Sequence, residues 1–120
     1  MSRVTLLGLP DDLAQQLAQV LRAEAHQVSR RTYVQDLQRR PRTQVVFVSG
    51  DSPDFRSTIA LLRGADLNLP VVVVTRMPGT SQWLDALEAG ASDYCGAPFE
   101  RVQVRWIMDS VAPAERRAAA

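Results

Sequence analysis

Lysine is absent from this sequence of 120 residues, whose 14 lysine-plus-arginine positions are all arginines. That absence excludes any chemistry that depends on a lysine amine. A single cysteine, Cys95, excludes an internal disulfide framework and fits a reducing compartment. No apolar run approaches the roughly 20 residues that span a bilayer, and the first residues lack the apolar core of a signal peptide. We therefore expect a cytoplasmic protein with no membrane partner.

The composition is that of an ordinary globular domain, with 46% hydrophobic and 22% charged residues. A chain of this length can bury one core, and we expect one domain over residues 1–112. Residues 113–120, rich in alanine and arginine, are expected to form a linker or tail towards a further domain. The net charge of +1 gives no electrostatic reason to expect nucleic acid as a direct partner.

Short apolar runs alternate with helical patterns five times along the chain. The run Pro70–Thr75 is apolar on both sides of the expected strand, which is typical of a central parallel strand covered on both faces. The alternation predicts a flavodoxin-like, doubly wound α/β fold with a parallel sheet in the order 2-1-3-4-5. The expected strands are 3–7, 27–29, 44–48, 70–75 and 94–95, and the expected helices begin near residues 10, 33, 53, 80 and 99, the second ending before Pro41.

The stretch "ALEAGASDYCGAPFE" (Ala86–Glu100) resembles the receiver domain of bacterial response regulators. Supporting matches are the run Pro70–Thr75 and the position of Pro53 after the third strand, and the resemblance covers residues 3–111. It implies a two-component signalling module rather than an enzyme. Such a module regulates an output domain or partner protein through protein contacts, and we expect transcription to be the controlled process.

Receivers take a phosphoryl group from a histidine kinase onto an aspartate at the end of the third strand. An acid pair after the first strand helps to hold Mg²⁺, and a lysine and a hydroxyl contact the phosphoryl oxygens. By resemblance, the acceptor position falls on Ser49, the acid pair on Gly8 and Leu9, and the lysine on Ala97. Thr75 retains the hydroxyl.

These losses are mutually consistent, because a buried lysine or acid pair left without its counter-charge would be costly. We therefore interpret the chain as a pseudo-receiver that acts independently of phosphorylation, with no metal and no cofactor. Tyr94 and Pro98 match other positions of the family, an aromatic switch residue and a proline after a cis bond.

Two acidic residues after the third strand leave an alternative open. Asp51 shares the strand parity of Ser49, so Asp51, or else Asp54, could serve as a relocated phosphoacceptor. Solvated loop acids are the favoured interpretation. Asp11 and Asp12 are interpreted as helix caps rather than metal ligands. A flavin carrier of the same fold is disfavoured, because "GLPDDL" carries carboxylates where a phosphate would need donors.

The last helical segment, Phe99–Val111, has more large apolar residues than one buried stripe can hold. The resemblance implies a dimer or effector surface on the fourth helix, fifth strand and fifth helix, with a partner protein or a second copy as its occupant. An arginine cluster around the second helix is interpreted as a solvated face. The candidate interface residues are Trp83, Asp93, Arg101, Arg105 and Trp106.

Overall fold

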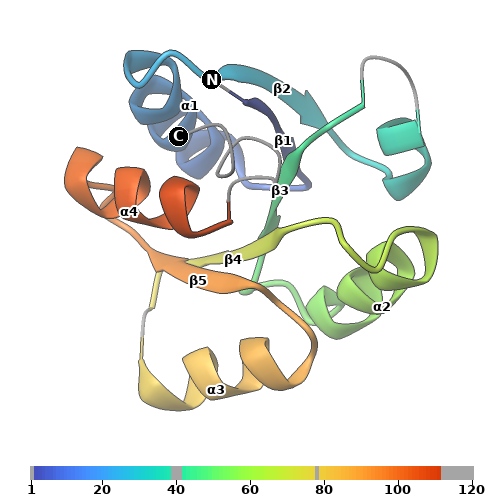
Figure 1. Cartoon of the computed structure of the whole chain (residues 1–120). Coiled ribbons are helices and arrows are strands. Elements are labelled where there is room, and N and C mark those ends of the chain that lie inside the picture. The colour runs from blue at the N-terminus through green and yellow to red at the C-terminus, as the bar shows by residue number, and fades with distance from the viewer. Residues whose placement is uncertain (1, 39–41, 78, 112–120) are drawn as a thin grey trace.

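Five parallel strands form one sheet in the order β2-β1-β3-β4-β5 in the computed structural model of the chain (Figure 1). The structure describes residues 2–38, 42–77 and 79–111. The predicted fold and strand order are confirmed. The strands are β1 (Arg3–Leu7), β2 (Gln27–Arg31), β3 (Val45–Ser49), β4 (Val71–Thr75) and β5 (Asp93–Gly96).

Helices cover both faces of the sheet, and each face has its own apolar core. Side chains alternate between the faces along each strand, so Val72 and Val74 join one core while Val71 and Val73 join the other. The first core lies under α1 (Asp11–Ala23) and α4 (Arg101–Val111). The second lies under α2 (Phe55–Ala65) and α3 (Thr80–Glu88). Burial on both faces explains why the inner strands β3 and β4 are apolar from Val45 to Val48 and from Val71 to Val74.

The second helical segment differs from the sequence prediction. The predicted helix over 33–39 is a single 3₁₀ turn, η1 (Val34–Gln38), and its Val34 and Leu37 pack against the second core. A proline three residues after the turn disfavours continuation as an α-helix, and the segment is too short for its own propensity to sustain one. The predicted end of this helix at Pro41 lies outside the described residues, as does the expected tail 113–120. The labels α3 and α4 therefore denote the fourth and fifth helical segments.

The carboxyl ends of β1, β3 and β4 are neighbours at one edge of the sheet, as in other doubly wound folds. The chain leaves the sheet there after Leu7, Ser49 and Thr75. Polar side chains carried by the segments that follow these residues and by the first turn of α1 are therefore brought together. Within residues 2–38, 42–77 and 79–111, no helix combines the length and hydrophobicity that a bilayer crossing requires.

Candidate functional site

Asp51 lies in the loop after β3 and contacts the end of β4. The hydroxyl of Thr75 donates a hydrogen bond of 2.5 Å to Oδ1 of Asp51, and the main-chain N–H of Arg76 donates one of 2.8 Å to Oδ2. Thr75 is buried, whereas the Asp51 residue is exposed. Both carboxylate oxygens of Asp51 are therefore engaged by donors of one neighbouring strand end.

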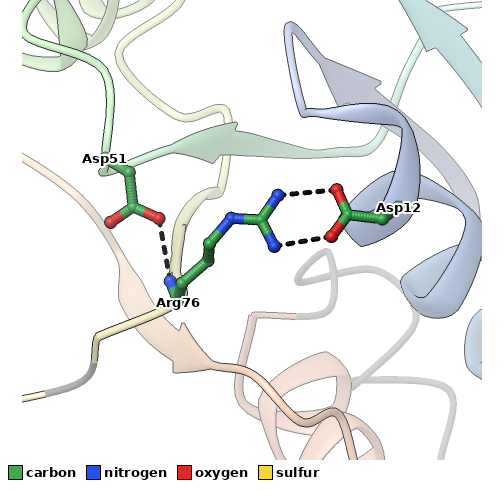
Figure 2. Close-up of polar contacts among 3 residues, drawn as sticks. All are labelled: Asp12, Asp51 and Arg76. Carbon is green, nitrogen blue, oxygen red and sulfur yellow. Dashed lines mark hydrogen bonds and ion pairs between the residues drawn. The ribbon is translucent and has the colours of Figure 1, made fainter.

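The side chain of Arg76 crosses from β4 to the start of α1. Its two terminal nitrogens donate to the two carboxylate oxygens of Asp12, at 2.5 and 2.6 Å, in a bidentate ion pair (Figure 2). The hydrogen bonds from Arg76 lower the pKa of Asp12 to about 2, and the same pairing raises the pKa of Arg76. The nearby charge of Asp51 acts on Arg76 in the same direction. The guanidinium of Arg76 thus binds Asp12, while the main-chain N–H of the same residue binds Asp51.

Gly50 lets the loop run close enough to β4 for these contacts. Its N–H donates to the carbonyl of Val74 at 2.7 Å, and a Cβ atom added to Gly50 would lie 2.5 Å from Cγ1 of Val73. Any side chain would therefore push the loop away from β4. In the sequence, Ser49-Gly50 indicates only that a strand ends there, so this role of the glycine was not predicted.

The positions assigned to the phosphorylation chemistry hold uncharged side chains with local structural contacts. Gly8 has a left-handed backbone (φ 66°), and Leu9 is buried in the first core. Oγ of Ser49, a buried residue, accepts the N–H of Asp51 at 3.3 Å. Ala97 packs against the first core and its N–H donates to the carbonyl of Thr75 at 2.9 Å.

Two of the remaining positions that the resemblance implies, Thr75 and Tyr94, contact the loop between β4 and α3. The hydroxyl oxygen of Tyr94 accepts the N–H of Gly79 at 3.1 Å, and the half-buried ring packs against the second core. Oγ1 of Thr75, besides donating to Asp51, accepts the N–H of Met77 at 3.1 Å. The peptide bond before Pro98 is cis. The Tyr94 and Thr75 side chains therefore anchor opposite ends of this loop.

The acids near the site have separate partners. Asp11 and Asp12 lie in the first turn of α1 as expected, but their carboxylates pair with Arg30 and Arg76 rather than capping the helix. The pair between Asp12 and Arg76 was not predicted. The sequence offers only an arginine directly after Thr75 as a signal. Asp54 immediately precedes α2, where its main-chain N–H donates to Oγ of Ser52 at 3.3 Å.

The carboxylates do not fit a Mg²⁺ site as they stand. Among the described residues, no cluster of three or more His, Cys, Asp and Glu side chains is arranged to hold a metal ion. Mg²⁺ prefers oxygen ligands in octahedral geometry, and the oxygens of Asp12 and Asp51 are already bonded to Arg76 and Thr75. The guanidinium supplies the positive charge at this edge.

The candidate interface residues divide into two groups. Arg101 and Arg105 donate to Glu24 at the end of α1, at 3.1 and 2.9 Å, and these bonds lower the pKa of Glu24. The two arginines thus hold α4 against α1. Trp83 and Trp106 are exposed on α3 and α4, and the carboxylate of Asp93 accepts the N–H of Tyr94 at 2.7 Å.

No protein-family model matches the chain, and no curated protein matches it either. Solved structures match it at low identity. The non-phosphorylated HemR receiver domain from Leptospira biflexa is 17% identical, with a TM-score of 0.73 over 95% of this chain and 97% of that one. A response regulator receiver domain protein from Clostridium thermocellum is 11% identical, with a TM-score of 0.80 over 99% and 98%.

NtrX from Brucella abortus is 16% identical to this chain, with a TM-score of 0.83. The match covers 98% of this chain but only 29% of the NtrX chain, so NtrX is a much longer protein. These likenesses define the fold of the chain as that of response-regulator receiver domains.

Proposed function

We propose that the chain is a receiver-type signalling module that acts through protein contacts and does not accept a phosphoryl group. The observation that carries this proposal is the bonding of Asp51, whose two oxygens accept the Thr75 hydroxyl and the Arg76 N–H. A carboxylate that attacks phosphorus must turn a lone pair towards the incoming phosphoryl group and needs positive charge around that group. Each oxygen of Asp51 accepts one donor from the end of β4, which leaves a lone pair on each oxygen but fixes the carboxylate against the sheet.

The charge of the site supports the same conclusion. Phosphoryl transfer needs positive charge, from a metal ion or a cationic side chain, to neutralise the phosphoryl oxygens. The cation beside Asp51 is Arg76, and its bidentate bond to Asp12 already uses two of its donors. Gly8, Leu9 and Ala97 add no charged group.

The alternative, an atypical receiver with Asp51 or Asp54 as acceptor, has one observation in its favour. The hydroxyl of Thr75 donates to Asp51 at 2.5 Å, so a phosphoryl group on Asp51 would lie beside the hydroxyl that contacts the phosphoryl oxygens in receivers. Phosphorylation of Asp51 would then require the carboxylate to turn from its two donors towards the phosphoryl group, and a cation to neutralise the phosphoryl oxygens.

Amide NMR spectra of the whole chain, with and without Mg²⁺ and beryllofluoride, separate the two functions. We expect no shift at Ser49, Asp51, Thr75 or Tyr94 at millimolar Mg²⁺. Saturable shifts at these residues that disappear in an Asp51→Asn variant would establish Asp51 as an acceptor. Asp54→Asn serves as the matched control, because it removes the other candidate acid without touching Thr75.

The module is proposed to regulate an output domain in the cytoplasm, one that controls transcription. The longer NtrX chain supports this arrangement, because a receiver-like fold makes up only part of it. The proposed contact surface is the side of the molecule formed by α3, β5 and α4. Trp83 and Trp106 support it, because large apolar side chains are exposed on both helices that flank the edge strand.

A further inference from the structure

A groove of about 810 Å³ runs between β5 and α4. We call it the acidic groove and define it by Asp93, Glu100, Val102 and Trp106, with Tyr94, Gly96, Pro98, Gln103, Ile107 and Ser110 completing its lining. It extends along α4 from Glu100 to Ser110, which corresponds to about 15 Å at the rise of an α-helix. The groove is thus long enough for about three turns of a second helix.

The wall that α4 contributes is apolar and exposed. Trp106 is 72% exposed and Val102 57%, and their spacing of four residues places them on one stripe of the helix. That stripe is opposite the buried residues of α4, Val104, Ile107, Met108 and Val111. These two side chains therefore contribute little to the core, and burying them would favour binding of an apolar partner.

The helix on the other side of β5 extends this surface. Trp83, Leu84 and Leu87 of α3 are exposed, whereas Ala86 is buried. Asp85 pairs with Arg56 of α2, so the flank of α3 that carries Asp85 faces α2. On helical spacing, the apolar flank of α3 points away from α2, towards the free edge of β5.

The charges of the groove have one sign. Its two charged lining residues are Asp93 and Glu100, and among the described residues no arginine lines it. Arg101 and Arg105 lie on the other flank of α4 and bind Glu24 of α1. In a two-fold contact between copies, the acids of one groove would need cations on the same face of the other copy, and the arginines of α4 are already bonded to Glu24.

We propose that the acidic groove binds a basic amphipathic segment of a partner protein rather than a second copy of this chain. Apolar side chains of the segment pack on Val102 and Trp106, and its arginines or lysines pair with Asp93 and Glu100. This inference rests on the proposed function only in taking the α3–β5–α4 side as the contact surface. It adds the chemistry of the partner.

The test uses two synthetic helical peptides of about 15 residues with the same leucine stripe. One carries arginine on its polar face and the other glutamate. Amide NMR titration of the whole chain measures both affinities. We expect the arginine peptide to shift Asp93, Glu100 and Trp106 and to bind at least about tenfold more tightly than the glutamate peptide. Its affinity should fall as salt rises from about 50 to 300 mM.

Variants of exposed residues locate the site without disturbing the core. Trp106→Ala and Glu100→Arg should each weaken the arginine peptide about tenfold. The matched control is Leu61→Ala on α2, a leucine that is 62% exposed but distant from the groove in sequence and fold, and it should leave the affinity unchanged.

Equal affinity for the two peptides, or amide shifts at residues outside the groove, would overturn the inference. So would a loss of peptide affinity in Leu61→Ala as large as that in Trp106→Ala. A dimer of this chain in sedimentation that Trp106→Ala dissociates would show that a second copy occupies the surface. Addition of beryllofluoride with Mg²⁺ distinguishes failure of the groove proposal from failure of the proposed function. Amide shifts at Asp51 would refute phosphorylation independence, whatever the peptides do. The absence of shifts at Asp51 would support phosphorylation independence, even if neither peptide binds.

Discussion

Arg76 binds both carboxylate oxygens of Asp12, a residue 64 positions earlier in the chain. The pair joins the end of β4 to the first turn of α1, directly beside Asp51 (Figure 2). Arg76 thus contacts both carboxylates, Asp12 through its guanidinium and Asp51 through its main-chain N–H. The positive charge of the guanidinium lies near both acids, because the charge of Asp51 also acts to raise the pKa of Arg76.

Removal of Arg76 should raise the pKa of Asp12. In Arg76→Gln the bidentate hydrogen bonds are lost, and the pKa should move from about 2 towards the ordinary 3.8. Carboxyl ¹³C NMR titration measures the change. The matched control is Arg30→Gln, which breaks the neighbouring pair with Asp11 and should leave Asp12 unchanged. An unshifted Asp12 in Arg76→Gln would contradict the pairing.

The same pair predicts an acid dependence of stability. The folded pKa of Asp12 lies below its unfolded value, so its contribution is present above about pH 4 and is lost as the pH falls towards 2. The melting temperature of the wild type should therefore fall more steeply over this range than that of Arg76→Gln. Parallel curves for the two proteins would show that the solvent-exposed pair contributes nothing measurable.

Thr75 and Asp51 should be energetically coupled. Thr75→Val keeps the shape of the buried side chain but removes the hydroxyl that donates to Asp51. We expect the free energy of unfolding to fall by about 1–2 kcal/mol, since the bond is charge-assisted. A double-mutant cycle with Asp51→Ala, measured by urea unfolding, should give a coupling energy of about 1 kcal/mol. Additive effects would mean that the contact does not stabilise the fold.

Two glycines offer a matched test of the close approach at the site. Gly50→Ala should destabilise the protein by about 1–3 kcal/mol, because the new methyl group would overlap Cγ1 of Val73. Gly64→Ala, inside α2, meets no atom within 4 Å and should stabilise it by about 0.5–1 kcal/mol through helix propensity. Opposite signs are the expected result of thermal unfolding. A neutral Gly50→Ala would show that the loop can relax without losing Asp51.

The sheet could be predicted because its signals are local. The valines from Val71 to Val74 fall alternately into two cores, so the strand is apolar at every position. The parity of Asp51 with Ser49 likewise predicted that the two side chains could point to the same side of the strand end, and the structure places the carboxylate of Asp51 against Thr75.

Other features depend on residues distant in sequence and left no local signal. No pattern indicates that Arg76 reaches Asp12. Arg63 of α2 is a similar case, because it donates to the carbonyls of Leu67, Leu69 and Gly90, which only the folded loops bring together. The failure at η1 has a different cause. Spacing predicted a helical segment there, but spacing alone does not distinguish a short α-helix from a 3₁₀ turn.

Cys95 should be almost unreactive in the folded protein. Burial raises the pKa of its thiol from 9.0 to about 12, so the thiolate fraction at pH 8 falls roughly 1,000-fold, and access to reagents is also blocked. Reaction with a chromogenic disulfide reagent should be slow in buffer and immediate in urea. Because the folded pKa exceeds the unfolded one, this residue's contribution to stability should decline as the pH rises from about 9 to about 12.

A Ser57→Cys variant in a Cys95→Ala background provides the fast reference for the thiol reaction, because it places a thiol on the exposed surface of α2. Native Cys95 reacting at the rate of that reference would show that β5 opens readily, and the groove beside it would then be less rigid than the structure indicates.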